Sequence, residues 1–320
     1  MAEIKTFKTL QDDVLGWSDD VEDTDTVRRN VRQAIAAAHR RRLMSRPWHF
    51  MLWEEAIPLT TVGGQRTYSL HSEYFKGFYF YNKTTGEYLE ELDKNTFHPG
   101  TQLRLSNVYM DDVASWQADT GSASRFILWG RSPVATQPTG GSVLTVESSV
   151  PGDGASQKLV IYGDTASGMQ TETIPCDTSG AVVFTRIVKV RKEGTWSGTA
   201  SLKAGSTTLL NLFTTEYGRS YQQMYLLKTP SMAESIEYRF FRQPSPLVED
   251  NDIQDLPQGF HDILVYDALL DLTTYNQVEP ISAKIWSANR QELLDALLEL
   301  DAEASSIGRM SASTLWIPRE

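Results

Sequence analysis

The hydrophobic positions recur at helical spacing at both ends of the chain and alternate in short runs through its middle. Near the N-terminus, the apolar residues from Asp25 to Ser45 fall three and four positions apart, which predicts one helix that ends before Pro47. The apolar residues from Phe7 to Leu15 predict a shorter helix that closes at Gly16. Together the two segments predict a helical hairpin.

A second helical pattern occupies the C-terminal part of the chain. The segment from Leu256 to Asn276 carries an apolar face, and Pro257 suits a first helical turn. After Pro280, apolar residues recur at spacings of seven, four and three, at Trp286, Leu293, Leu297 and Leu300. Because neither end of the chain is large enough to bury its own apolar stripe, we expect one bundle of roughly four helices made by both ends.

Short alternating runs separated by Gly, Pro and Asn predict strands between residues 48 and 150, with a short helix around Val108 to Ala118. Two runs, Phe75 to Tyr81 and Glu87 to Leu92, predict a hairpin with a five-residue loop ending in glycine. Four consecutive aromatic residues alternate between its two faces, so that both faces have to be covered by core or by a neighbouring subunit. These candidate intersubunit contacts are Phe78, Tyr79, Phe80 and Tyr81.

The residues from 151 to 230 hold about six further runs punctuated by Gly and Ser, which is typical of a small β-sandwich of immunoglobulin-like type. The Cys-Trp-Cys signature of true immunoglobulins is absent, because Cys176 is the one cysteine. The predicted class is α+β, with a helical bundle from both chain ends, a central β region and an inserted sandwich. The expected segments are a helical hairpin (1–47), a β-rich region (48–150), the sandwich insertion (151–230), a strand and helices completing the core (231–304) and a docking tail (305–320).

Charge is segregated along the chain. The segment from Asp25 to Arg46 holds seven arginines and one acid in a chain of net charge −11, whereas the segment from Glu249 to Glu303 holds thirteen acids against two basic residues. Such segregation steers identical subunits into one orientation. We interpret the basic helix as an assembly surface that meets the acidic segment of an adjoining copy. Its candidate contact residues are Arg28, Arg29, Arg32, Arg40, Arg41 and Arg42.

A simpler interpretation explains part of this pattern. Acids at the start of the basic helix would cap it, and the arginines at its end would complement its dipole, each contact adding about 0.3 to 1 kcal/mol. This alternative leaves the arginines near the positive end of the helix, Arg28, Arg29 and Arg32, without an explanation. Both interpretations stay open at this point.

The overall composition narrows the class of protein. A chain of 320 residues suggests about two compact units at ~150 residues each. Residues 1 to 16 lack the apolar run of a secretion signal and no stretch of ~18 apolar residues occurs, so we expect a soluble protein made in the cytosol with no membrane partner. A pI near 5.0 disfavours wrapping of DNA by the whole protein, although a local basic face would still allow non-specific proximity to it.

Motifs of common catalytic chemistry are missing from the sequence. No GxxxxGK[ST], GxGxxG, HExxH, CxxC or GxSxG pattern is present, and no two of the five histidines have the spacing of paired ligands on one helix. The stretch from Glu249 to Asp255 begins like a calcium loop but has Asp255 where the turn needs glycine and His261 where a glutamate is needed. We therefore expect no catalytic residue, no cofactor and no metal.

The C-terminal tail is small and polar except for Leu315, Trp316 and Ile317. Burial of these three side chains would return about 1.5 to 3 kcal/mol each, whereas ordering the whole tail would cost at least about 1 kcal/mol per residue. The pattern favours a docking tip on a tether, and a frayed terminus with chance apolar residues is the alternative.

The chain resembles the head-tail connector adaptors, or head completion proteins, of tailed bacteriophages, which are related to the tail tubular and tail accessory adaptors of short-tailed phages. The resemblance rests on the helical hairpin running into Arg46-Pro47-Trp48-His49-Phe50, the aromatic β region, and the segment from Leu256 to Leu264 that opens a helix. It covers about 240 residues and leaves the inserted sandwich aside.

The resemblance implies a non-enzymatic virion protein located in the neck between head and tail. Family members form rings, commonly of twelve subunits, beneath the portal protein, with the helical bundles at the DNA channel and C-terminal tails that grip the portal. It implies as partners further copies of the chain, the portal, and a tail, neck or stopper protein, with Leu315, Trp316 and Ile317 docking to the portal. The sandwich insert departs from this pattern and would decorate the collar or bind fibres.

Two other functions stay open from the sequence. The insert could serve as a carbohydrate-binding or adhesion module through aromatic residues such as Tyr162, Trp196 and Tyr217. A cell-wall glycoside hydrolase is the third hypothesis, suggested only by the 41 acids and by how phage particles enter cells.

Overall fold

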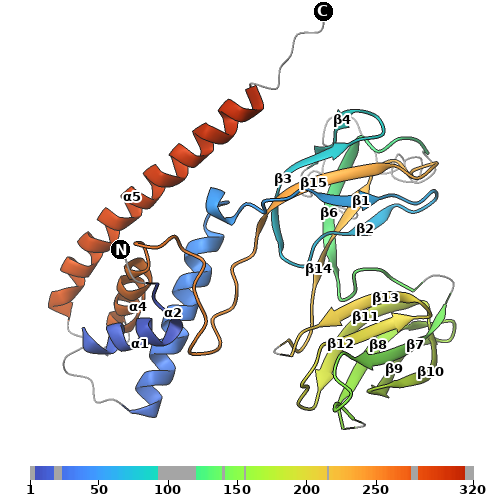
Figure 1. Ribbon diagram of the computed structural model, residues 1–320, viewed down its shortest axis with the longest axis horizontal. Coiled ribbons are helices and arrows are strands. Elements are labelled where there is room, and N and C mark those ends of the chain that lie inside the picture. Colours follow the sequence, from blue (N-terminus) through green and yellow to red (C-terminus); the bar gives the residue numbers. More distant parts are fainter. Residues whose placement is uncertain are drawn as a thin grey trace, which may run out of the picture. The chain divides into compact units, whose positions relative to one another are not determined.

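The structure of the chain is a computed structural model that describes residues 4–17, 24–92, 120–138, 141–154, 156–214, 216–274 and 280–313. It is a mixed α+β structure with helices at both chain ends and, in the sequence between them, sheets whose strands are mostly antiparallel (Figure 1), which confirms the predicted class. The chain forms two compact units, a helical unit of residues 1–54 and 240–320 and a β unit of residues 55–239. The helix expected around Val108 to Ala118 lies outside the described residues.

The helical unit is built by both ends of the chain, as predicted. Its elements are α1 (Phe7–Gly16), α2 (Asp25–Met44), the short 3-10 helix η1 (His49–Met51), α4 (Asp262–Thr274) and α5 (Pro280–Ser313). Threonine hydroxyls start the first two helices, because Thr6 Oγ1 accepts from Thr9 N at 3.3 Å and Thr24 Oγ1 accepts from Val27 N at 3.3 Å. The predicted positions of both helices are confirmed to within one residue.

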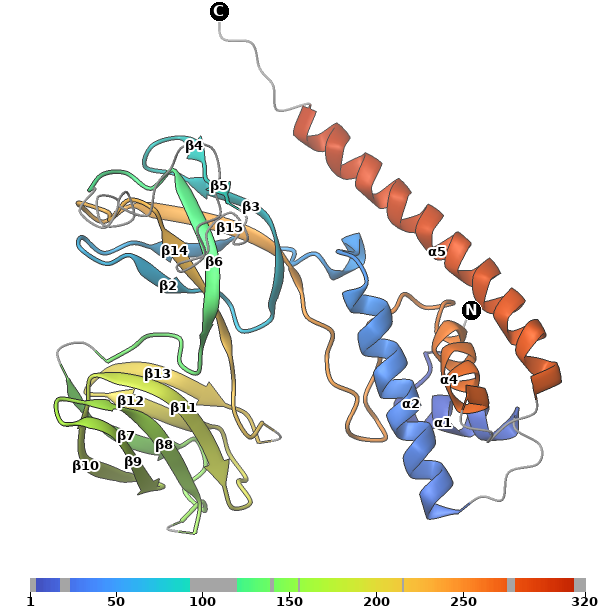
Figure 2. The ribbon, with the colours of Figure 1, turned by 180° about the vertical axis from the view of Figure 1, so that it is seen from behind.

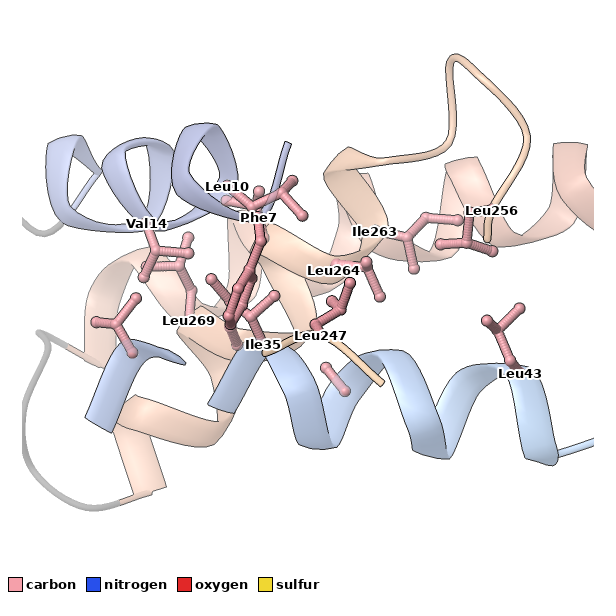
Figure 3. Packing of buried hydrophobic residues seen from close by; sticks show 14 of the residues in the cluster. Phe7, Leu10, Val14, Ile35, Leu43, Leu247, Leu256, Ile263, Leu264 and Leu269 are labelled. Atoms are coloured by element: carbon pink, nitrogen blue, oxygen red, sulfur yellow. The ribbon is translucent and has the colours of Figure 1, made fainter. Parts of the chain in front are cut away.

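The apolar stripes of these helices share one core, shown in Figure 3. Helix α4 is its central element, since it packs against α1, α2 and α5. Side chains from α1 and α2 point toward those of α4 and of the loop that precedes it, as Figure 3 shows for Phe7, Leu10, Ile35, Leu264 and Leu269. Burying each such side chain stabilises the unit by about 1.5 to 3 kcal/mol, so the two chain ends hold each other in place.

The β unit contains two four-stranded sheets that flank the insertion in sequence. Their strands are β1 (Ile57–Thr60), β2 (Thr67–Ser69), β3 (Tyr74–Asn82), β4 (Glu87–Tyr88), β5 (Glu90–Glu91), β6 (Arg125–Ser132), β14 (Tyr221–Leu226) and β15 (Ser235–Arg242). The sheet orders are β1-β15-β3-β4 and β2-β14-β6-β5. The Phe80 ring lies 5.2 Å from the Tyr238 ring of its own sheet and 4.4 Å from the Phe126 ring of the other, so it contributes to a core that both sheets share.

The predicted aromatic hairpin is present, with a shorter second strand. Tyr81 pairs with Tyr88, and Gly86 takes the positive φ of 75° that the loop needs. The chain then changes sheet, because Glu90 and Glu91 pair in parallel with the start of β6 instead of continuing along β3. The run from Glu87 to Leu92 is therefore divided between β4 and β5.

The inserted part is a two-sheet sandwich. Its strands are β7 (Ser142–Ser148), β8 (Lys158–Thr165), β9 (Gly168–Pro175), β10 (Thr178–Phe184), β11 (Arg186–Glu193), β12 (Ala200–Ala204) and β13 (Thr207–Leu212). The sheets have the orders β10-β7-β12-β13 and β11-β8-β9, and residues of both form one apolar core around Leu144, Leu159, Phe184 and Leu202. Its assignment to the immunoglobulin-like type stays a prediction.

Strand pairing differs from the sequence interpretation at both edges of the insert. The sequence places the run from Ser142 to Ser148 in the preceding β region, but β7 pairs with β10 and β12 of the sandwich. It places the run from Tyr221 to Leu227 in the insert, but β14 pairs with β2 and β6 of the other sheets. Both runs are short and apolar, and such a pattern does not specify which distant strand will be the partner.

Candidate interaction surface of the helical unit

The arginines on the inward side of α2 pair with acids that follow much later in the same chain. Arg42 donates to both carboxylate oxygens of Asp267 on α4, at 2.8 and 2.6 Å, and Arg290 of α5 approaches the same carboxylate at 3.4 Å. The Asp267 side chain is 2% exposed and Arg42 is 19% exposed. Three helices are thus joined at one buried carboxylate, where low dielectric makes the attraction strong.

Two further arginines of α2 reach the C-terminal acids at the surface. Arg32 donates to Asp250 at 2.8 Å and to the Val248 carbonyl at 2.6 Å. Arg41 donates to Asp271 at 2.9 Å, and this hydrogen bond raises the pKa of the arginine. Exposed pairs of this kind stabilise a protein by about 0 to 1 kcal/mol each.

The segment Arg46-Pro47-Trp48-His49, which carries part of the family resemblance, anchors the end of α2 to α5. Arg46 donates to Asp301 at 2.9 Å, and the His49 backbone N–H donates to the other oxygen of the same carboxylate at 2.6 Å. The Arg46 guanidinium also lies 4.9 Å from the Trp48 ring centroid. The Asp301 side chain is fully buried, so this segment fixes one face of α5.

The charge pairing that the sequence indicated is therefore present, but these pairs lie within one chain. Arg32, Arg41, Arg42 and Arg46 meet carboxylates of the acidic C-terminal segment, and Arg28 lies 3.9 Å from Asp12 on α1. The sequence interpretation placed such partners in an adjoining copy. Intrachain pairs now account for most of the arginines, because folding brings the two chain ends into one unit.

Sequence reasoning missed Arg46 and Asp301 as a pair. A signal was present, since Asp301 follows Leu297 by four residues and thus lies on the apolar stripe of its helix. An acid at such a position predicts a buried cationic partner, because an unpaired buried charge is very costly. Asp267 fits the same rule, three residues after Leu264.

The outward side of α2 has a different character. Four exposed residues of α2 follow one another at spacings of four, four and three and therefore lie on one side of the helix. We call this side the basic outer face, and its residues are Arg29, Gln33, Ala37 and Arg40. Among the residues that the structure describes, neither Arg29 nor Arg40 has an ion-pair or hydrogen-bond partner. These two of the six predicted contact arginines remain available for another molecule.

Helix α5 carries the opposite charge on its outward side. Four exposed acids of α5 recur at spacings of three, four and four. We call this side of the helix the acidic outer face, and its residues are Glu292, Asp295, Glu299 and Glu303. They lie on the side of the helix opposite the buried residues Trp286 and Leu297. Within the described ranges, Glu292 and Glu299 have no cationic partner, and Asp295 accepts from Gln291 at 2.8 Å.

The four aromatic residues predicted as intersubunit contacts are not equivalent. Phe80 is buried among Tyr238 and Phe126, so the core of its own chain covers it. Phe78 is 50% exposed, and Tyr79 and Tyr81 lie beside Tyr88, which is 71% exposed. An intersubunit role therefore stays a prediction for Phe78, Tyr79 and Tyr81, and Phe80 is explained as core.

Two histidines of the helical unit are structural. His39 is buried, and its Nε2 accepts from the Asp255 N–H at 3.2 Å. Burial lowers the pKa of His39 to about 4, so the ring is neutral near pH 7. His261 Nδ1 accepts from the Lys5 N–H at 3.2 Å, and burial lowers its pKa as well. Both side chains act as neutral hydrogen-bond acceptors for backbone groups.

The acidic stretch that begins like a calcium loop does not converge on one point. Asp250 pairs with Arg32, Asp252 accepts from the Val248 and Glu249 N–H groups, and Asp255 pairs with Arg242 at 3.0 Å. Within the described ranges, no three His, Cys, Asp or Glu side chains are grouped as ligands of a metal ion.

Cys176 is buried, which raises the pKa of its thiol to about 11.

The aromatic residues named for sugar stacking in the insert differ in exposure. Trp196 is 5% exposed and its Nε1 donates to the Glu193 carbonyl at 2.8 Å, so its ring belongs to the core. Tyr217 is exposed, and the Tyr162 ring centroid lies 5.8 Å from the Lys189 ammonium.

None of the helices that the structure describes is long and apolar enough to cross a membrane.

These features define a protein whose candidate sites are charged surfaces suited to contacts between macromolecules. Residues 5–163 match the family model of the SU10 adaptor protein. The matched part spans α1, α2, the strands β1 to β7 and most of β8, just under half of the chain. This similarity supports a structural adaptor protein of a bacteriophage, a class found in the virion. No curated protein sequence matches the chain.

Proposed function

We propose that this protein is a ring-forming adaptor that joins the portal of a tailed phage to its tail or neck. The observation that carries the proposal is the similarity to the SU10 adaptor protein over the N-terminal helices and the first β region. An adaptor between two virion parts needs contacts with copies of itself and with a neighbour on each side. The helical unit offers two exposed faces of opposite charge for such contacts.

In this proposal about twelve copies surround a central channel, as the family resemblance implies, and the helical units face the DNA. Arg29 and Arg40 are the arginines of α2 that would meet a neighbouring copy or the phosphates of the genome, since intrachain carboxylates engage Arg32, Arg41 and Arg42. Neutralising few phosphates gives weak, salt-dependent binding that lets DNA pass.

The C-terminal tip is the proposed contact with the portal. Helix α5 has 34 residues and is thus about 50 Å long. Figure 2 shows it running beyond the other helices of its unit. Asp301 is the last residue described as buried, and the three residues that follow it, Ala302, Glu303 and Ala304, are exposed. Leu315, Trp316 and Ile317 lie outside the described part, and their docking role is a proposal from the sequence.

Electron microscopy of the purified chain, alone and mixed with portal protein, tests the ring. The proposal expects rings about a central channel, either free or on portal particles. A chain that stays monomeric and does not bind portal particles would contradict it.

A truncated chain tests the docking tip. Deletion of the residues after Ser311 removes the three apolar side chains and leaves every described buried residue in place. We expect portal binding to weaken by at least about ten-fold, because three anchors of about 1.5 kcal/mol or more are lost. Unchanged binding by the truncated chain would reject the docking role.

A further inference from the structure

The two charged outer faces lie on different helices of the helical unit, each on the exposed side of its helix. Arg42 of α2 and Arg290 of α5 both reach Asp267 of α4, so the inward sides of α2 and α5 converge on the same central helix. Figures 1 and 2 show α4 between α2 and α5. The outward sides of α2 and α5 are both exposed, so the basic outer face of one chain does not lie against its own acidic outer face.

The basic outer face is suited to a partner helix. Its cations stand at the two ends, at Arg29 and Arg40, which are eleven residues or about 16 Å apart along the axis. Gln33 and Ala37 lie between them and carry no charge, and the short alanine lets another helix approach closely. The face has no intrachain neighbour that would neutralise its two guanidinium groups among the described residues.

The acidic outer face has the same length. Glu292 and Glu303 are also eleven residues apart, so their separation along α5 is again about 16 Å. Asp295 and Glu299 fall between them on the same side of the helix. The exposed residues Ala288 and Ala296 flank the carboxylates, and their short side chains let another helix approach this side of α5 closely.

We propose that the basic outer face of one copy docks on the acidic outer face of the next copy. The proposal rests on the proposed ring function and names the helix pair that would form each contact. Arg29 and Arg40 lie against the carboxylates between Glu292 and Glu303, with Gln33 and Ala37 facing the helix between them. Because the two faces are different and lie on different helices of the unit, the contact is head to tail and closes into a ring when the rotation allows.

A second copy of the chain would be a binding partner for both charged faces, whereas DNA would be a partner for the basic outer face alone. A phosphate backbone would accept Arg29 and Arg40 but would be repelled by the acidic outer face. The matching spacing of eleven residues provides a register that a flexible polyanion does not require. Complementary charge also penalises copies that meet in the wrong orientation.

A pair of reciprocal variants tests the contact. Arg29→Glu with Arg40→Glu makes the basic outer face acidic, and Glu292→Lys with Asp295→Lys and Glu299→Lys makes the acidic outer face basic, with Glu303 as its one remaining carboxylate. Each variant alone brings like charges together, so we expect its self-association, measured by analytical ultracentrifugation, to weaken by at least about ten-fold. An equimolar mixture restores opposite charges at every contact of an alternating assembly, and we expect it to associate as the wild type does.

The control carries the same change of charge as the arginine variant, on a different part of the chain. Arg131→Glu with Lys189→Glu alters two exposed cations of the β unit and should leave association unchanged. The proposal is overturned if either reciprocal variant assembles normally, if their mixture stays dissociated, or if the wild type remains monomeric at all concentrations. It is also overturned if reversal at Arg29 and Arg40 abolishes DNA binding while rings persist. A monomeric chain that still binds portal particles would reject this contact and leave the adaptor function standing.

Discussion

The inward and outward faces of α2 carry the same residue type and differ in what pairs with it. Inward, Arg42 shares the buried carboxylate of Asp267 with Arg290, so its charge contributes to the packing of three helices. Outward, Arg29 and Arg40 are exposed and have no partner among the described residues. The comparison teaches that an arginine-rich helix can serve folding on one side and still present exposed arginines on the other, where we propose that a second copy binds. Charge changes on the inward side should therefore affect the free energy of unfolding, and charge changes on the outward side should affect self-association.

The largest effect on stability is expected at the buried acid. Asp267→Asn keeps the size of the side chain but leaves two largely buried guanidinium groups, of Arg42 and Arg290, without their anion. We expect the helical unit to lose about 3 kcal/mol or more of its free energy of unfolding. Hydrogen exchange of peptides from α2 and α4 measures this unit separately from the β unit. A loss below about 1 kcal/mol would show that the shared carboxylate contributes little.

The next largest effect is expected from pH at His39. Its pKa in the folded chain is about 4, below the ordinary 6.5, so the unfolded chain binds the proton more readily. The neutral ring contributes up to about 3 kcal/mol to the free energy of unfolding. This contribution is fully present above pH 6.5 and is lost as the pH falls from 6.5 toward 4.

A variant isolates the histidine from the carboxylates that also titrate at low pH. His39→Gln retains an acceptor for the Asp255 N–H but does not titrate. We expect the difference in unfolding free energy between wild type and variant to change over this pH range, in the direction that favours the variant in acid. A difference independent of pH would contradict the assignment of a buried neutral ring.

A smaller effect is expected one turn farther along α4. Asp271→Asn removes the partner of Arg41, which is 55% exposed and can be rehydrated. We expect a loss below about 1 kcal/mol, because exposed ion pairs contribute little. This variant is the matched control for Asp267→Asn, since both change the same side-chain chemistry in the same helix. Equal losses at the two positions would remove the distinction between the buried and the surface pair.

The smallest effect on stability is expected at the basic outer face. Arg29→Glu lies near the positive end of α2 and Arg40→Glu near the negative end, so their interactions with the helix dipole nearly cancel. We expect the double variant to unfold within about 0.5 kcal/mol of the wild type in the dissociated state. A large destabilisation would place these arginines in the folded core and not in an interaction surface.

Much of the helical unit could be predicted from the sequence, because helical periodicity and capping act over a few residues. The bounds of α1 and α2, and the joining of both ends into one bundle, follow from the apolar stripes around Ile35 and Leu264. The partner of each strand could not be predicted, since the assignments of β7 and β14 depend on pairing between distant segments. The edges of the insert were misplaced for that reason.

The candidate surface was predicted only in outline. The sequence indicated that basic and acidic segments would meet, which the pairs of Arg32 with Asp250 and of Arg41 with Asp271 confirm. The sequence interpretation nevertheless assigned the pairing of these charges to an adjoining copy, because composition carries no information on which copy supplies a charge. Sorting Arg29 and Arg40 from the others required the packed side of the helix to be known.

The most direct test of the account is a high-resolution electron microscopy structure of the assembled protein, free or in the virion neck. The account predicts a ring in which the guanidinium groups of Arg29 and Arg40 lie within about 4 Å of carboxylates of the acidic outer face in the next copy. A ring in which both guanidinium groups face solvent, or contact DNA or a different element of the neighbouring copy, would contradict it.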